Sequence, residues 1–81
     1  MRTEVNEYIV ADTEICHGKP TFKGTRIMVS DIIELVADGV SNEKIIDDYP
    51  SLNNDMIRSA LEHAARIMRR KEHYVKFKVP A

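Results

Sequence analysis

The sequence predicts a mainly α-helical fold: a helix-turn-helix of three helices, with short strands or a hairpin before it and one strand after it. Three observations predict it. Capping residues mark three consecutive segments, the last of these carries apolar residues at helical spacing, and the flanking stretches show short or alternating apolar patterns. At 81 residues, the chain has room for one domain, which we expect to span 1–81.

The first third of the chain predicts short strands separated by turns. The apolar run Tyr8-Ile9-Val10 follows a polar lead-in, and Thr21-Phe22-Lys23 lies between the turn sequences Gly18-Lys19-Pro20 and Lys23-Gly24-Thr25. A further apolar run, Ile27-Met28-Val29, could also be extended. We therefore expect at least two short strands ahead of the helices.

Side chains that cap helices then mark three helix starts. Ser30, Ser41 and Asn53 can each accept a hydrogen bond from the free N–H groups of the turn that follows. Gly39 suits the left-handed position that closes a helix, and Pro50 ends the short second helix, because the residue before a proline avoids helical geometry.

The third helix, roughly residues 54 to 71, has the clearest pattern. Its apolar residues recur at helical spacing: Ile57, Ala60, Leu61, Ala64, Ile67 and Met68. A shorter face in the first helix consists of Ile32, Ile33 and Val36. A short helix, a brief connection and a longer third helix form the outline of a helix-turn-helix.

The tail alternates strictly from Tyr74 to Val79, which predicts a strand with one apolar and one basic face. We expect this strand to pair with the Tyr8–Val10 strand or with its counterpart in another chain. Such an exposed edge could also join the sheet of a partner protein.

Composition limits the classes of function. The net charge of −1 argues against a protein that coats nucleic acid. The single cysteine excludes an internal disulfide, and no stretch of 18 residues is apolar, so we expect a cytoplasmic protein without a signal peptide or membrane contact. A chain this small builds a modest core, so we expect a homodimer, a higher oligomer or another protein partner.

Two stretches of the sequence carry a family signature: Ile15-Cys16-His17-Gly18-Lys19-Pro20-Thr21-Phe22-Lys23-Gly24-Thr25-Arg26-Ile27-Met28-Val29, and then Asp48-Tyr49-Pro50 with Leu52. With them the chain resembles the domain-of-unknown-function 433 family (DUF433). The resemblance covers roughly residues 8–65, and Thr13 departs from it, since the family often has proline there. It implies a homeodomain-like helix-turn-helix. It also implies a VapB-type antitoxin of a type II toxin–antitoxin system, whose cognate partner is a PIN-like ribonuclease toxin and which also binds operator DNA.

Four residues are the candidate DNA-binding residues: Arg26, Asn53, Asn54 and Arg58. Asparagine and arginine read adenine and guanine edges, and the start of the third helix would face the major groove. Three acids around the same turn oppose DNA binding, so a bare solvated face is an equal alternative: Asp47, Asp48 and Asp55. For Arg26 the structural alternative is an ion pair with an acid near the first helix, beside a Gly24 that needs positive φ.

Five basic residues are the candidate partner-binding residues: Arg66, Arg69, Arg70, Lys76 and Lys78. By analogy with other antitoxins, such cations would insert among the metal-binding carboxylates of a PIN-like nuclease. The alternative is an ordinary basic helix end and a solvated strand face.

Cys16 and His17 are adjacent, but adjacency provides neither a general base nor an orienting group, and the three histidines show no ligand spacing. We therefore expect no catalytic residue, no metal and no cofactor, and a protein that is not an enzyme. A small dimerisation or protein-interaction module without DNA binding is the alternative function.

Overall fold

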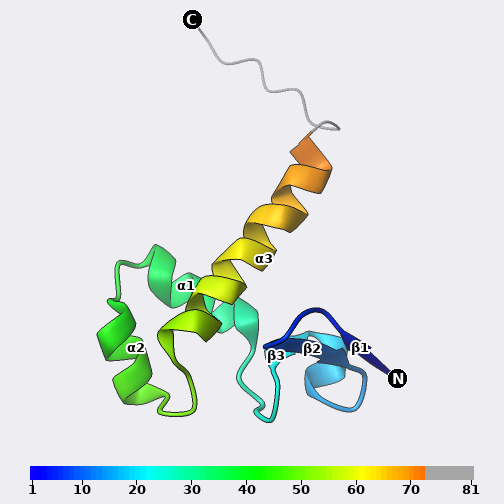
Figure 1. The fold of residues 1–81 in the computed structure, drawn as a ribbon, viewed down its shortest axis with the longest axis horizontal. Helices are drawn as coiled ribbons and strands as arrows, with labels where there is room; N and C mark the ends of the chain where they lie inside the picture. The colour runs from blue at the N-terminus through cyan, green and yellow to red at the C-terminus, as the bar shows by residue number, and fades with distance from the viewer. Residues whose placement is uncertain (73–81) are drawn as a thin grey trace, which may run out of the picture.

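A three-stranded antiparallel sheet precedes three helices in the computed structural model, which describes residues 1–72 (Figure 1). The strands are β1 (Arg2–Glu4), β2 (Ile9–Asp12) and β3 (Pro20–Phe22), and the helices are α1 (Val29–Ala37), α2 (Asn42–Asp48) and α3 (Asn54–Glu72). The three helices and short strands before them confirm the prediction, but the complete sheet makes the fold α/β rather than mainly α. The tail strand predicted at 74–79 lies outside the described residues.

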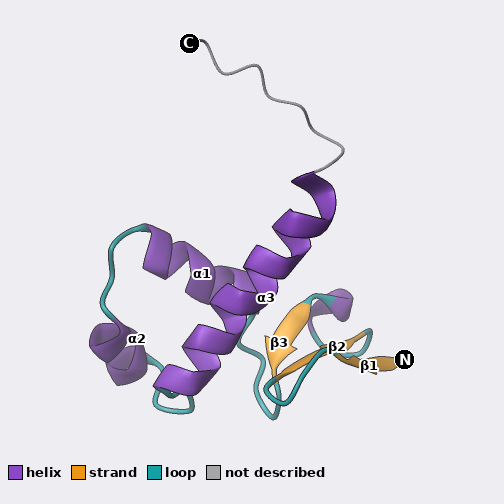
Figure 2. Cartoon of the chain, turned by 45° about the horizontal axis from the view of Figure 1, so that its top comes forward, coloured by secondary structure: helices purple, strands orange, loops and turns teal. Residues whose placement is uncertain are grey.

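Helix α1 starts beside the sheet and passes behind α3 towards α2, and the C-terminal half of α3 projects beyond the other elements (Figure 1, Figure 2). Helix α1 joins the two parts, because it packs against β3 as well as against α2 and α3. The buried core lies where these elements meet and consists of Ile9, Phe22, Val29, Ile32, Ile45, Leu52, Met56, Ile57 and Ala60.

Strand β1 is absent from the sequence-based prediction because all three of its residues are exposed and polar in character, so no apolar pattern marks it. It forms through backbone pairing with β2, in the register Thr3 opposite Ala11. The turn between the two strands is held by Asn6, whose Oδ1 accepts hydrogen bonds from the N–H groups of Tyr8 at 2.8 Å and Ile9 at 3.0 Å.

The prediction that Ser30 caps the first helix is wrong. Helix α1 already begins at Val29, with Met28 at the capping position and no side-chain cap. The reason lies in the preceding backbone, where Met28 forms a bridge to Thr21 at the end of the sheet. The chain therefore enters the helix directly from an extended residue, and Ser30 becomes an exposed residue of the first turn.

The other helix boundaries are confirmed. Ser41 Oγ accepts from the N–H of Lys44 at 3.2 Å, and Asn53 Oδ1 accepts from that of Met56 at 2.9 Å. Gly39 has φ +84° and donates its N–H to the Val36 carbonyl at 3.0 Å. The next N–H along the chain reaches the Leu35 carbonyl, also at 3.0 Å, which completes a Schellman motif at the end of α1.

The apolar face predicted for the third helix is buried over only half its length. Ile57 and Ala60 are fully buried, whereas Leu61, Ile67 and Met68 are 38%, 40% and 66% exposed. Beyond Ala60 the helix has left the core, so its later apolar residues contact little of the domain.

The tail was expected to pair with the Tyr8–Val10 segment, but strand β2, which contains Ile9 and Val10, has no free edge. Strand β2 pairs with β1 along one side and with β3 along the other, with Val10 opposite both Glu4 and Thr21. An added strand would have to displace one of these neighbours. Among residues 1–72, no helix is both long enough and apolar enough to cross a membrane.

Thr21→Val is expected to raise the free energy of unfolding by about 1 kcal/mol, because an unpaired buried hydroxyl is costly to desolvate. Thr21 is fully buried, and its Oγ1 has no hydrogen-bond partner within the described part of the chain. Valine has the same shape without that hydroxyl. Urea unfolding followed by circular dichroism measures the change.

Thr25→Val is the matched control, because the Thr25 hydroxyl is fully used. It donates to the Phe22 carbonyl at 2.8 Å and accepts from the N–H of Ile27 at 3.1 Å. This substitution is expected to destabilise the protein by about 1–2 kcal/mol. Equal effects of the two substitutions would contradict the assignment of Thr21 as unpaired.

Candidate functional site

The glycine-rich signature before α1 builds a backbone scaffold rather than a ligand cradle. Gly24 has φ +76°, as the structural alternative requires, and the turn it forms returns the chain so that Phe22 N–H donates to the Ile27 carbonyl at 3.1 Å. Cys16, His17 and Gly18 form a left-handed 3-10 turn with φ values of 50°, 57° and 84°. Cys16 and His17 are not glycines, so this left-handed conformation costs about 1–2 kcal/mol for each of them. Contacts with the rest of the domain must offset this cost.

Arg26 lies at the end of this scaffold, exposed to solvent. Its carbonyl accepts a weak hydrogen bond from Cys16 Sγ at 3.6 Å, which ties the two ends of the signature together. Its guanidinium forms no ion pair within residues 1–70, whose side chains the structure describes, and so has no partner acid near α1. The side chain is free to contact a phosphate, but it is remote from the start of α3 along the chain.

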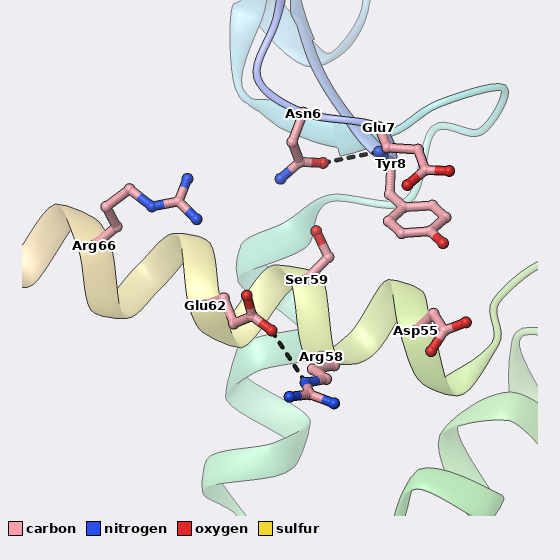
Figure 3. Close-up of a pocket in the computed structure, with 8 residues that line it drawn as sticks. All are labelled: Asn6, Glu7, Tyr8, Asp55, Arg58, Ser59, Glu62 and Arg66. Carbon is pink, nitrogen blue, oxygen red and sulfur yellow. Dashed lines mark hydrogen bonds and ion pairs between the residues drawn. The ribbon is translucent and has the colours of Figure 1, made fainter.

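The other three candidate DNA-binding residues lie at the start of α3, and one polar atom of each side chain is hydrogen-bonded within the domain. Asn53 Oδ1 caps the helix, and Asn54 Oδ1 accepts from Asn42 Nδ2 at 3.4 Å. Arg58 Nε donates to Glu62 Oε1 at 3.1 Å, in an exposed pair on successive turns (Figure 3).

Acidic residues dominate the surface around this helix start. Asp47, Asp48 and Asp55 are all exposed. An open cleft of about 310 Å³ lies between α3 and the connection of β1 to β2, and its charged residues are three acids and two arginines: Glu7, Asp55, Glu62, Arg58 and Arg66 (Figure 3). The Glu7 carboxylate, together with partial burial and Asp55, raises the pKa of the Tyr8 hydroxyl. The electrostatics of this end of α3 therefore disfavour a phosphate backbone.

The C-terminal end of α3 has the opposite character. A hollow of about 250 Å³, which we call the basic hollow, is lined by Val5, His63, Arg66, Ile67 and Arg70. The residues that line it include no carboxylate, and Arg66 and Arg70 form no ion pair within residues 1–70, whose side chains the structure describes. Two arginines thus flank an apolar floor, and Arg66 lies at the border with the acidic cleft, which it also lines.

The pKa of His63 is lowered within the basic hollow. Desolvation is the main cause of its lowered pKa, and the positive charges of Arg66 and then Arg70 add to the effect. Both arginines therefore disfavour the protonated form of His63. Arg69 is exposed but does not line the hollow, so the structure brings together only two of the five predicted partner-binding residues. Lys76 and Lys78 lie outside the described residues.

Stability is expected to fall as the pH drops below about 6.5, the ordinary pKa of histidine. Because the folded protein lowers the pKa of His63, the unfolded chain binds a proton more readily, and protonation favours unfolding. Urea unfolding at pH 8 and pH 6 measures the difference. His63→Gln should show a smaller loss of stability over this range, and an unchanged loss would contradict the assignment.

Three residues of the basic hollow were not among the candidate partner-binding residues: Val5, His63 and Ile67, the last of which was predicted only as part of an apolar helix face. Val5 comes from the polar lead-in and has no pattern of its own, since only the β1–β2 hairpin places it beside α3. His63 could have been found from its spacing, because it lies three and seven residues before Arg66 and Arg70 on one helix face. No group of three acidic, histidine or cysteine side chains suited to a metal ion occurs within the described part.

Residues 9–64 match the family described as protein of unknown function (DUF433). This match confirms the resemblance predicted for residues 8–65. The chain is also similar to a Sinorhizobium fredii protein named uncharacterized protein y4eO, with 36% identity over 58 residues, which is 72% of this chain. The aligned part is 26% of that relative, so the chain spans about a quarter of its length. No solved structure matches the chain.

Proposed function

Since the chain belongs to the DUF433 family, we propose that it is a binding protein rather than an enzyme, and that it acts as the antitoxin of a type II toxin–antitoxin pair. Its partner would be a PIN-like ribonuclease, as the resemblance to VapB-type antitoxins implies. The basic hollow at the projecting end of α3 is the observation that carries this proposal.

The chemistry of the basic hollow fits an acidic protein partner. Arg66 and Arg70 lie beside the apolar side chains of Val5 and Ile67, and none of the residues that line the hollow is acidic. A partner carboxylate would bind the arginines, since arginine binds carboxylates with two parallel hydrogen bonds. An apolar side chain next to that carboxylate would pack against Val5 and Ile67. Nucleases of the PIN class gather carboxylates around their metal ions, and so offer this group.

Co-expression with the product of the adjacent gene, which the proposal expects to be a PIN-like ribonuclease, tests the proposal. The native chain is expected to form a complex and to rescue growth. Arg66→Ala/Arg70→Ala is expected to weaken the complex about 100-fold, because removing one side of a desolvated charge pair costs about 2–5 kcal/mol. Calorimetric titration of the purified toxin measures the affinity.

Arg58→Ala is the matched control. Arg58 is another arginine of α3, 81% exposed and already paired with Glu62, and it lies outside the basic hollow. Its substitution should change the affinity less than about threefold, as for a surface ion pair. If neither complex nor growth rescue occurs with the native chain, the antitoxin proposal fails. If both arginine variants behave alike, the proposed site is wrong.

Operator DNA is the second target that the resemblance implies, through a homeodomain-like helix-turn-helix made by α2 and α3. The short α2, its five-residue connection and the long α3 are compatible with that motif. The exposed acids around the connection act against phosphate contacts, so we rank DNA below the protein partner. Fluorescence anisotropy with promoter DNA at low salt tests this, and a flat titration would exclude DNA binding by the free protein.

The dimerisation module without DNA binding is the remaining alternative. It predicts self-association with neither toxin nor DNA binding, so the co-expression experiment and the promoter-DNA titration both distinguish it from the antitoxin. A homodimer is compatible with both functions.

A further inference from the structure

The projecting half of α3 carries a second unpartnered surface, distinct from the basic hollow. Four apolar residues, which we call the apolar stripe, lie on the helix face away from the hollow: Leu61, Ala64, Ala65 and Met68. Leu61 is 38% and Met68 66% exposed, although neither belongs to a loop or a chain end. Helix α3 continues for about 18 Å beyond its last core residue, Ala60, at 1.5 Å per residue.

The spacing of the apolar stripe is the same in both directions along the helix. Leu61 lies three residues before Ala64, and Met68 lies three residues after Ala65. Two such stripes placed antiparallel bring each large side chain opposite a large one and the four alanines to the centre. Small residues at the crossing allow close approach of the two helices, as a two-fold interface requires of a self-complementary patch.

The charges beside the apolar stripe select the antiparallel orientation. Glu62 and Arg69 lie on the same flank, near Arg58, which pairs with Glu62 across one turn. Antiparallel packing brings like flanks together, and the centre between Ala64 and Ala65 sets Glu62 of one copy within about 3 Å, along the axis, of Arg69 of the other. The arrangement therefore creates two symmetric opposite-charge pairs. A parallel arrangement would instead place the basic ends of both helices side by side.

We propose that the apolar stripe of α3 binds a second copy of this chain, in an antiparallel helix pair centred on Ala64 and Ala65. The pair leaves the basic hollow open on the other side of α3. Its test needs the full chain alone, so its failure is independent of the toxin proposal.

Sedimentation velocity of the full chain over a range of concentrations, at low salt, tests the pair. The native chain is expected to dimerise, and Ala65→Lys is expected to weaken the dimer at least tenfold, because it places two cations at the two-fold axis. Ala37→Lys is the matched control, since Ala37 is also an exposed helical alanine, at the end of α1. It should leave the dimer unchanged, and circular dichroism should report folded protein for all variants.

Charge exchange tests the orientation. Glu62→Arg and Arg69→Glu are each expected to weaken the dimer at least tenfold, because each makes two like-charge pairs. The double variant Glu62→Arg/Arg69→Glu is expected to recover to within about threefold of the native dimer. A monomeric native chain, or an Ala65→Lys dimer as strong as the control, would overturn the interface. A double variant as weak as the single ones would overturn the antiparallel geometry.

Discussion

Phe22→Ala is expected to lower the free energy of unfolding by about 3–5 kcal/mol, the usual cost of emptying a buried aromatic site. Phe22 is the largest fully buried side chain and stands at the end of β3, opposite Ile9. It is also where the sheet turns back towards α1, because its N–H and carbonyl hold the turn that leads to Ile27. Its loss would weaken the sheet and the junction with the helices together.

A loss of this size takes much of the stability of a small domain, which is typically about 5–15 kcal/mol. Urea unfolding followed by circular dichroism is the measurement. Phe22→Leu is the control, because it keeps most of the volume and should cost less than about 1.5 kcal/mol. A Phe22→Ala variant as stable as Phe22→Leu would contradict the central place of this residue in the core.

Ile45→Ala is expected to cost about 2–5 kcal/mol, and to release α2 before the rest of the domain. Ile45 is the single buried residue of this seven-residue helix, with no exposed surface. So short a helix has little stability of its own and depends on tertiary packing. Removing its anchor therefore removes most of what holds it against α1 and α3.

Hydrogen exchange distinguishes local release from general destabilisation. Amides of α2 should exchange faster in Ile45→Ala, by more than the amides of α1 do. Ile46→Ala is the matched control, because Ile46 is only half-buried in the same helix and should affect exchange much less. Equal protection in α1 and α2 would show that the domain opens as a unit.

The helices were predictable because their boundaries depend on local chemistry. Ser41, Asn53 and Gly39 satisfy backbone groups of their own helix ends, so sequence spacing alone locates them. The start of α1 was not predictable in the same way. It depends on the bridge between Met28 and Thr21, a contact with the sheet that no helix signal contains.

The sequence predicted the positive charges of the basic hollow but not the hollow itself. Sequence identified Arg66 and Arg70 as part of a basic run, but their convergence depends on helical phase and on Val5, which the β1–β2 hairpin delivers. Arg58 stays a predicted DNA-binding residue, but its Nε donates to Glu62 one turn later, a pairing that the sequence-based prediction did not consider. A pair four residues apart is visible in the sequence, and could have reduced the weight of Arg58 beforehand.

The order of the sheet has a consequence for how fast the chain folds. Strands β1, β2 and β3 are neighbours in space in the same order as along the chain, and each pairs antiparallel with the next. The helices likewise follow one another through short connections. Little loop entropy must be lost before native contacts form, so the topology has a low contact order. For a mixed domain of sheet and helices, we therefore expect folding faster than that of all-β domains, which takes about milliseconds to seconds.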